Sequence, residues 1–236
     1  MRIALVGYGR MGKAIEAIAI ERGHEISARF TSKNTNIDAA LKESSDVAIE
    51  FTSPSAAFSN LSACAAHGIP VVTGTTGWFD QLNAIEDLVD EHKGSLLYAS
   101  NFSIGMNLFM AANRYLAERM NLQSDYSAHI HEIHHVHKLD APSGTAITLA
   151  EELVGKVDRY TQWSTEHKSD DSLPVSDERI GEVPGTHTIT WENEIDKLSF
   201  THEAKNRKGF ALGAVLAAEW LVGKQGVFTM RDMLQL

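Results

Sequence analysis

The first hundred residues alternate short apolar runs with longer segments in which apolar positions recur at helical spacing. The apolar runs predict strands over 3–7, 25–30, 47–52, 70–74 and 95–100. The segments with helical spacing predict helices over 10–22, 54–66 and 78–92, whereas the polar residues 31–45 predict a loop in place of one helix. Strands that are apolar at nearly every position and alternate with helices indicate a parallel sheet covered on both faces.

The pattern changes after residue 105. Helices are expected over 106–120, 143–156 and 209–223, and a strand over 126–133. Residues 158–180 are rich in Ser, Asp, Glu and Lys, which predicts a loop or lid. "THTITWEN" (186–193) and "KLSFTHEA" (197–204) alternate as antiparallel strands do. We therefore expect an α/β protein with a parallel-sheet domain, residues 1–104 plus 207–236, and an inserted α+β domain with a mixed sheet, residues 105–206.

Composition narrows the classes of function. The 236 residues carry a net charge of -10 with histidine neutral, and such an acidic surface repels phosphate backbones, so no nucleic-acid partner is expected. No apolar run is long enough to span a bilayer, so no membrane partner is expected either. The single cysteine, Cys64, cannot form an internal disulfide, as is usual in a reducing compartment. We expect a cytoplasmic protein.

A glycine-rich turn follows the first strand. "VGYGRMG" places Gly7, Gly9 and Gly12 in G-x-G-x-x-G spacing at the start of a helix. Gly7 allows the tight turn, Gly9 lets the backbone approach a pyrophosphate, and Gly12 allows close packing of helix and strand. The positive end of the helix then faces the anion. The pattern predicts dinucleotide binding, and its alternative is a merely tight strand–helix turn.

The end of the second strand bears on the choice of cofactor. Sites that prefer NAD usually carry an acid there for the ribose 2′-hydroxyl, but "ARFTSKN" supplies Thr31 and Lys33 and no acid before Asp38. Without a carboxylate, a 2′-phosphate is not repelled, and Lys33 could pair with it. We expect NADPH, NADH or both, with NADPH favoured if Lys33 is more than a solvated lysine.

Two further turns follow strands of the first domain. In "TGTTGW", Gly74, Thr75 and Thr76 could contact the nicotinamide ribose, or form only a hydrogen-bonded threonine turn. In "YASNFSIG", Asn101 could bond the carboxamide of the cofactor or cap its own turn. Both turns are therefore candidates for the same cofactor site.

Five of the eleven histidines fall between residues 129 and 137. A zinc site needs three convergent ligands, but Glu132 is the one acid nearby and Lys138 would repel a cation, so we expect no metal. On a strand, His129 and His131 would point to one face and His134 to the other. A solvated histidine-rich edge remains the alternative for His129, His131 and His137.

An acid/base site explains more of this segment. Histidine titrates near neutral pH, and Lys138 would lower the pKa of a neighbouring histidine. Ser143 is a candidate helix N-cap, and the amides of Gly144 and Thr145 would point out of the helix N-terminus toward an anion. Arg207 is a further cationic candidate. Together these groups predict a pocket for a small carboxylate substrate with a proton donor beside it.

The stretch "EIHHVHKLDAPSGTA" (132–146) resembles the E-x-H-H-x-x-K-x-D-A-P-S-G-T-A signature of the 4-hydroxy-tetrahydrodipicolinate reductase (dihydrodipicolinate reductase) family. "GYGRMG", "GTTG", "SNFSIGMN", "IGEVPGTH" and "THEAKNRKGFALGAVLAAEWL" extend the resemblance along the chain. It implies an NAD(P)H-dependent oxidoreductase of the diaminopimelate route to lysine. It also implies a Rossmann-like nucleotide domain and a mixed-sheet domain that binds the dicarboxylate substrate and builds a homotetramer.

The resemblance also implies a role for each matched residue. His134 would be the acid/base residue and Lys138 the second proton donor, while His135 and the amides of Ser143, Gly144 and Thr145 would hold the substrate carboxylates. The cofactor would contact Gly7, Tyr8, Gly9, Arg10, Met11, Gly12, Gly74, Thr75, Thr76, Ala99, Ser100, Asn101 and Phe102. The glycine turn is a compact form of the family's, and Thr31 replaces its usual acid. A metal-dependent hydrolase and a regulator that binds NAD(P) without turnover remain as alternatives.

Overall fold

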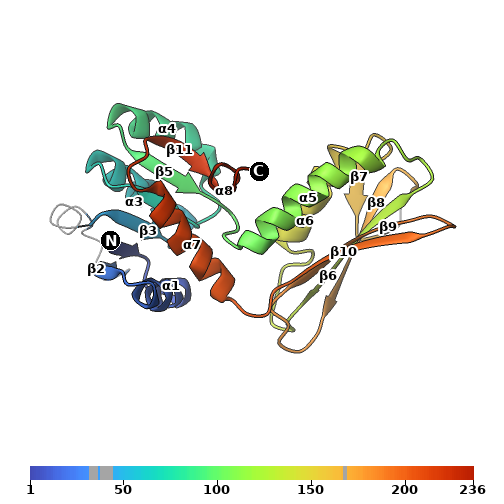
Figure 1. Cartoon of the computed structure of the whole chain (residues 1–236), viewed down its shortest axis with the longest axis horizontal. Helices are drawn as coiled ribbons and strands as arrows, with labels where there is room; N and C mark the ends of the chain where they lie inside the picture. Colours follow the sequence, from blue (N-terminus) through green and yellow to red (C-terminus); the bar gives the residue numbers. More distant parts are fainter. Residues whose placement is uncertain (32–36, 38–44, 167–168) are drawn as a thin grey trace. The chain divides into compact units, whose positions relative to one another are not determined.

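The computed structural model describes residues 1–31, 37, 45–166 and 169–236. The chain forms two compact units: unit 1 is Met1–Ile104 with Lys208–Leu236, and unit 2 is Gly105–Arg207 (Figure 1). Arg207 thus falls in the second unit. Most of the predicted loop over 31–45, including Lys33, lies outside the described residues.

Unit 1 is built on a six-stranded sheet with the order β11-β5-β4-β3-β1-β2, in which every pairing is parallel. Its strands are β1 (Arg2–Val6), β2 (Glu25–Phe30), β3 (Val47–Glu50), β4 (Val71–Thr73), β5 (Ser95–Tyr98) and β11 (Gly226–Thr229). The first five lie where the apolar runs predict strands. The sequence pattern missed β11, which has four half-buried residues and therefore no apolar run of its own.

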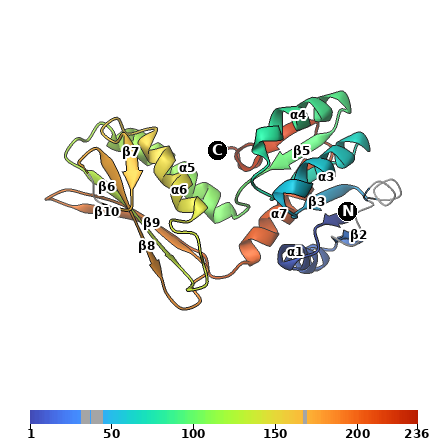
Figure 2. The same ribbon diagram turned by 180° about the vertical axis from the view of Figure 1, so that it is seen from behind.

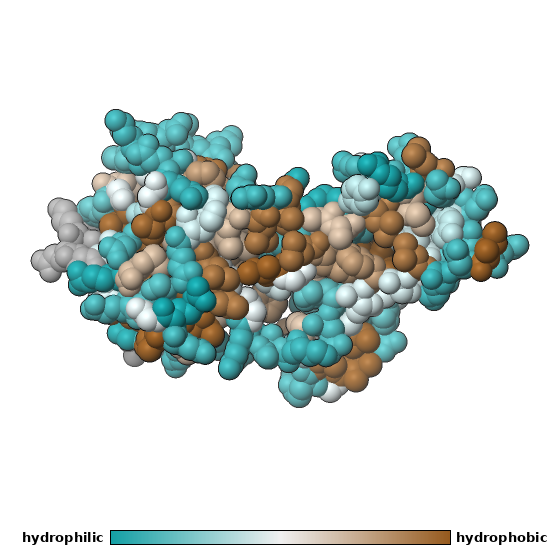
Figure 3. Space-filling view, in the orientation of Figure 1, coloured by the Kyte–Doolittle hydropathy of each residue, from teal (hydrophilic) through white to brown (hydrophobic). Residues whose placement is uncertain are grey.

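Helices cover both faces of this sheet. α1 (Arg10–Glu21) and α7 (Lys208–Leu221) lie on one face (Figure 1), and α3 (Pro54–Ala66) and α4 (Leu82–Glu91) lie on the other (Figure 2). Ile3 and Leu5 of β1 pack into the first layer, and Ala4 and Val6 pack into the second, because successive side chains of a strand point to opposite faces. The outer side of α4 is hydrophilic (Figure 3).

The C-terminal part of the chain completes unit 1. The face that α7 turns to the sheet is rich in small residues, and a Cβ atom added to Gly213 would lie 1.7 Å from the carbonyl oxygen of Phe102. This close approach requires glycine. A 3₁₀ turn (Phe79–Gln81) precedes α4, and α8 (Met230–Leu234) follows β11. None of the helices in the described ranges is long and apolar enough to cross a membrane.

Unit 2 holds a five-stranded mixed sheet with the order β10-β9-β6-β8-β7. Its strands are β6 (Ser127–His134), β7 (Gln162–Ser164), β8 (Ser172–Arg179), β9 (Thr186–Glu192) and β10 (Lys197–Glu203). β6 pairs parallel with β8 and antiparallel with β9, and β9 pairs antiparallel with β10 as predicted. The predicted fold class, a Rossmann-like parallel sheet with a separate mixed sheet, is confirmed.

The prediction of a loop or lid over 158–180 is wrong. This segment contains β7 and β8, and β8 lies next to the central strand β6. Its polar composition hides a strand pattern, because Leu173 and Val175 point into the core while polar residues fill the other positions. Over a long window, the polar composition therefore masks a short alternation of apolar and polar residues.

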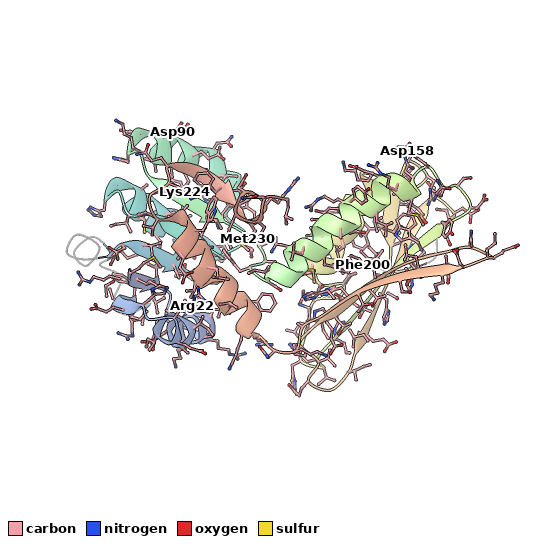
Figure 4. The ribbon with its side chains drawn as sticks, in the orientation of Figure 1. Arg22, Asp90, Asp158, Phe200, Lys224 and Met230 are labelled. Carbon is pink, nitrogen blue, oxygen red and sulfur yellow. The ribbon has the colours of Figure 1, made fainter. Side chains whose placement is uncertain are left out.

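Two helices cover one face of the mixed sheet. They are α5 (Ile104–Met120) and α6 (Gly144–Val154), and Met106, Leu149 and Leu153 pack against Ile130 of β6 within one hydrophobic core. Phe200 of β10, labelled in Figure 4, adds to this core. Its ring stacks on Phe109 of α5 with centroids 4.5 Å apart. The end of β6 and the start of α6 are thereby fixed by packing.

Candidate functional site

The glycine turn between β1 and α1 has a backbone conformation and close contacts that require glycine at two positions. Gly7 has a φ of +99°, and a Cβ atom added there would lie 1.9 Å from the carbonyl oxygen of Phe51. A Cβ atom on Gly12 would lie 2.3 Å from the carbonyl oxygen of Gly7, whereas one on Gly9 would meet nothing within 4 Å. Gly7 and Gly12 are therefore required by the fold, and Gly9 leaves open space where a ligand can approach the backbone.

A cleft of about 420 Å³ opens beside this turn. It is lined by Gly7 and Gly9, by Thr31 after β2, by Thr52 after β3, and by Asn60 of α3. The cleft thus lies at the carboxyl ends of parallel strands, where doubly wound sheets bind their ligands. Thr31, which stands in place of an acid, is exposed at its edge.

Tyr8 and Arg10 extend the turn. The Tyr8 hydroxyl donates to a carboxylate oxygen of Glu16, and Arg29 pairs with the same carboxylate while its guanidinium lies 5.7 Å from the centre of the Tyr8 ring. The neighbours of Gly7 are therefore held by contacts from α1 and β2. Arg10, the first residue of α1, is exposed, and Met11 packs partly against the core.

The turn after β4 is tightly bonded. The Thr75 hydroxyl oxygen accepts a hydrogen bond from the Thr52 amide at 2.8 Å, and its carbonyl oxygen accepts one from Trp78 Nε1 at 2.8 Å. A Cβ atom on Gly74 would lie 2.1 Å from the Phe51 ring. Thr75 thus links this turn to the cleft. Thr76 is exposed, and a cofactor contact from Gly74, Thr75 or Thr76 stays a prediction.

The segment after β5 contains a hydrogen bond that stabilises its own turn. Asn101 Oδ1 accepts a hydrogen bond from the Ser103 amide at 2.9 Å, the capping role that was left open. The Phe102 side chain is buried in the core with its ring 5.7 Å from that of Phe51. Ser100 is exposed and Ala99 is half-buried. Cofactor contacts from these residues stay predictions.

In unit 2, β6 separates its histidines between two faces. His129 Nε2 and His131 Nδ1 both lie 2.8 Å from the Ser176 hydroxyl on one face, as the alternation predicts. His134, the last residue of β6, is buried on the other face. Its ring lies edge-on to that of His187, with centroids 5.1 Å apart. The site is thus built on the face that packs against the helices.

Glu132 is the centre of this buried site. Its Oε1 accepts a hydrogen bond from the Ser143 amide at 2.8 Å, and its Oε2 accepts one from the Ser143 hydroxyl. His187 Nε2 lies 3.3 Å, and His134 Nδ1 3.4 Å, from Oε2. Burial raises the pKa of Glu132, but hydrogen bonds from His187 and Ser143 outweigh it and hold the pKa at about 2. Glu132 is therefore ionised at neutral pH.

His134 is held in its neutral form. Burial lowers its pKa to about 4, and the charges of His187, Lys138 and Arg179 act in the same direction, whereas Glu132 opposes them. Loss of water around an imidazolium disfavours the charged ring more than one buried carboxylate favours it. Near neutral pH, the ligand-free protein therefore presents His134 as a proton acceptor.

This lowered pKa predicts a pH-dependent stability. Between about pH 6.5 and 4 the unfolded chain protonates His134 and the folded chain does not, so the contribution is complete above 6.5 and is lost as the pH falls. We expect His134 to lower the free energy of unfolding by about 2 kcal/mol between pH 8 and pH 5. Denaturant titrations of wild type and His134→Gln at both pH values measure it. An equal drop in both proteins contradicts the prediction.

The start of α6 presents backbone amides beside this buried site. Ser143 is the N-cap, as predicted, because its hydroxyl oxygen accepts a hydrogen bond from the Ala146 amide at 3.2 Å. The Ser143 amide is directed at Glu132, so it is already engaged. Gly144 is exposed and Thr145 half-buried, and the first amides of an α-helix have no acceptor within the helix. These two amides can therefore bind a carboxylate.

The loop between β6 and α6 carries the remaining predicted groups. Lys138 Nζ lies 2.8 Å from both carboxylate oxygens of Asp140. His135 Nε2 lies 3.1 Å from Arg207 Nη2, so these two candidates meet. The exposed His137 lies 3.4 Å from Glu182. The loop ends in a cis peptide bond between Ala141 and Pro142.

Comparison with known proteins assigns the chain to a family. The N-terminal model of dihydrodipicolinate reductase matches residues 1–102, and the C-terminal model of the same enzyme matches residues 105–234. The chain belongs to the dihydrodipicolinate reductase family. The predicted family and the predicted class of enzyme, an NAD(P)H-dependent oxidoreductase, are therefore confirmed.

Relatives in this reductase family match the whole chain. A 4-hydroxy-tetrahydrodipicolinate reductase from Christiangramia forsetii is 48% identical over 234 residues, which are 99% of this chain and 98% of the relative. Another, from Thiobacillus denitrificans, is 33% identical over 268 residues, covering 100% of this chain and 99% of the relative. Both matches extend over both units.

Solved structures share the reductase fold. Dipicolinate-bound dihydrodipicolinate reductase from Paenisporosarcina sp. TG-14 aligns with a TM-score of 0.83 and 22% identity, covering 99% of each chain. The diaminopimelate dehydrogenase of C. glutamicum, solved with its ligand, aligns with a TM-score of 0.51 and 15% identity over 97% of this chain and 92% of the other. At these identities the structures show a common fold.

Metal binding at this reductase site was predicted to be absent, yet the structure assembles a candidate set of ligands. One donor atom each from Glu132, His134 and His187 lie within 4.8 Å of one another. However, the Glu132 oxygens already accept the hydrogen bonds of Ser143, and Arg179 Nη2 lies 3.6 Å from Oε1. Hydrogen-bond donors and a guanidinium favour an acid/base site over a cation site.

Sequence reasoning missed two groups of this reductase site. His187 comes from β9, directly opposite Glu132 in the β6–β9 register, and Arg179 ends β8. Arg179 lies in the segment that was interpreted as a loop. A signal for His187 was present, because "THTITWEN" puts His187, Ile189 and Trp191 on one face. A histidine in an otherwise apolar row is a candidate for a buried polar site.

Proposed function

We propose that this chain reduces 4-hydroxy-tetrahydrodipicolinate to tetrahydrodipicolinate with NAD(P)H, in the diaminopimelate route to lysine. The observation that carries the proposal is the buried pair of Glu132 and His134 beside the N-terminus of α6, within the family's signature motif. The names of the relatives and the dipicolinate in one solved structure support a small dicarboxylate as substrate.

Unit 2 would bind the substrate. The amides of Gly144 and Thr145 would hold one carboxylate at the positive end of α6. His135 and Arg207, 3.1 Å apart, would bind the second. Ser143 would contribute as the N-cap that orients the two amides, because its own amide is directed at Glu132.

Unit 1 would bind the cofactor. The cleft beside Gly7–Gly12 fits a dinucleotide, because Gly9 leaves its backbone open and α1 begins there. The segments Gly74–Thr76 and Ala99–Phe102 would complete the site. When bound, NAD(P)H supplies a hydride to the substrate ring. Lys33, outside the described residues, would pair with the 2′-phosphate of NADPH.

The proton would come from unit 2. His134 is neutral in the ligand-free protein, and a bound dianion would raise its pKa because opposite charge favours the imidazolium. Lys138 would serve as the second donor. Hydride and proton together reduce the substrate with release of one water, and the positioned donors stabilise charge that develops on the ring nitrogen.

A spectrophotometric assay of NADPH and NADH oxidation tests the function. We expect oxidation that depends on 4-hydroxy-tetrahydrodipicolinate and is unchanged by a chelator, because the proposed chemistry uses protein groups and cofactor alone. Cofactor binding without oxidation would support a nucleotide-binding regulator. Loss of activity in the chelator, restored by a divalent metal, would favour a metal enzyme. In the same assay, an unchanged NADPH preference in Lys33→Ala would reject the role of Lys33.

We also propose that unit 1 is the nucleotide domain, that unit 2 is the substrate and oligomerisation domain, and that the protein is a cytoplasmic homotetramer. The family resemblance supports this assembly. Light scattering of the purified protein measures its mass, and a monomer would reject the assembly.

A further inference from the structure

We propose that Glu132, supported by His187, is a positioning residue that couples the proton-transfer histidine to the carboxylate-binding end of α6. The inference rests on the proposed function. The buried carboxylate of Glu132 lies next to two parts of the site that belong to different elements. These are His134 at the end of β6 and Ser143 at the start of α6.

The contacts of Glu132 come from three other elements of the fold. Ser143 donates its amide to Oε1 and its hydroxyl to Oε2, which ties the N-cap of α6 to β6. His187 approaches Oε2 from β9, and Arg179 approaches Oε1 from β8. With no exposed surface, Glu132 can move little, because each of these groups would lose its buried partner.

The position of Glu132 favours one arrangement of the protons on both histidine rings. An ionised carboxylate can only accept hydrogen bonds, so His187 Nε2, 3.3 Å from Oε2, carries a proton. His134 Nδ1 forms no hydrogen bond, but it lies 3.4 Å from the same negatively charged oxygen, and this charge favours the proton on Nδ1. The nitrogen of His134 that can exchange a proton with a substrate is then Nε2.

The missing side chain of Gly185 leaves room beside Nε2 of His134. A Cβ atom added to Gly185 would lie 3.0 Å from Nε2, and Gly185 has a φ of +153°. A larger residue there would press on the reacting nitrogen. The backbone before β9 and the carboxylate on β6 thus act on opposite nitrogens of one ring.

The charge of Glu132 should also matter when His134 takes up a proton. The carboxylate stabilises an imidazolium, whereas Lys138, Arg179 and His187 disfavour it. Asp140 and Asp177 are paired to Lys138 and Arg179. Removing the negative charge leaves only the unfavourable groups. His134 should then be harder to protonate and free to change tautomer.

Glu132→Gln tests the proposal, because it keeps the size of the side chain and removes the charge. We expect kcat to fall by about 10²–10⁴-fold, the scale for disabling an acid/base histidine through its carboxylate partner. Because His134 must be protonated to donate, the alkaline limb of the kcat pH profile should shift to lower pH. Long-range ¹H–¹⁵N NMR spectra of the histidine rings should show His134 protonated at Nδ1 in wild type and as a tautomer mixture in the variant.

Two His187 variants test the supporting role. Glutamine can place an N–H donor near the position of Nε2, so His187→Gln should retain most of kcat, whereas His187→Phe should lose on the order of 10²-fold. His129→Gln is the matched control, because His129 lies on the opposite face of β6 and contacts Ser176. It should leave kcat unchanged. Thermal melts of each variant check folding.

The outcomes separate the inference from the proposed function. Absence of turnover by wild type rejects the proposed function. The NMR spectra need no substrate, so they still test whether Glu132 sets the tautomer of His134. A folded Glu132→Gln with kcat within threefold of wild type and the same His134 tautomer overturns the inference. If Glu132→Gln does not fold, the two His187 variants provide the test. Equal losses of kcat in His187→Gln and His187→Phe overturn the inference.

Discussion

Replacing His134 by glutamine should lower kcat by about 10²–10⁴-fold, the usual contribution of a positioned general acid or base. Glutamine keeps a polar side chain but cannot take up and release a proton near neutral pH. Its KM for NAD(P)H should remain within about threefold of wild type, because a change confined to the chemical step lowers kcat without weakening ground-state binding. Steady-state kinetics with both substrates varied measure the two constants.

His137→Gln is the control for this experiment. His137 follows His134 by three residues. Its side chain is 74% exposed and lies 3.4 Å from the exposed Glu182. Its replacement should leave kcat unchanged. Near-normal turnover by a folded His134→Gln would reject the proton-transfer role and direct attention to Lys138.

Replacing Gly7 by alanine should destabilise unit 1 by about 3 kcal/mol or more, because the new Cβ would lie 1.9 Å from a backbone oxygen at a φ of +99°. Replacing Gly9 should instead leave stability nearly unchanged, since a Cβ there meets nothing within 4 Å. Gly9→Ala should weaken NAD(P)H binding by about 10–100-fold, because the methyl group would stand where the pyrophosphate approaches.

Thermal melts and fluorescence titrations with NAD(P)H distinguish the two glycines. Gly23→Ala is a control for strain alone, because Gly23 has a φ of +83° but an added Cβ would meet nothing within 4 Å. It should lower stability by about 1–2 kcal/mol without changing cofactor affinity. Equal affinity of Gly9→Ala and wild type would contradict a pyrophosphate at this turn.

The local sequence predicted those parts of the fold that have their own periodic signal. The five apolar runs of the first hundred residues and the alternation at 186–193 each carry enough buried residues to be recognised. β11 and β7 do not, since they are short and mostly half-buried, and β5, the partner of β11, lies far away in the chain. Such strands exist because neighbouring strands offer them hydrogen bonds, and a single segment does not contain that information.

The site shows the same limit. The motif at 132–146 identified His134, Lys138 and the N-cap Ser143 because these residues lie close together in sequence. The register of β6 against β9 brings His187 to Glu132 across more than fifty residues. Only that register turns Glu132 from one acid in a histidine-rich stretch into the centre of a hydrogen-bonded site.

The return of the chain to unit 1 at Lys208 has a consequence for the order of events during synthesis on the ribosome. Unit 2 is continuous in sequence and can fold as soon as it has emerged. Unit 1 is completed later, because β5 lacks its neighbour β11, and the core around Ile3 lacks α7, until residues 208–229 are made. Residues 1–104 are thus translated before unit 2 but gain their full set of partners after it.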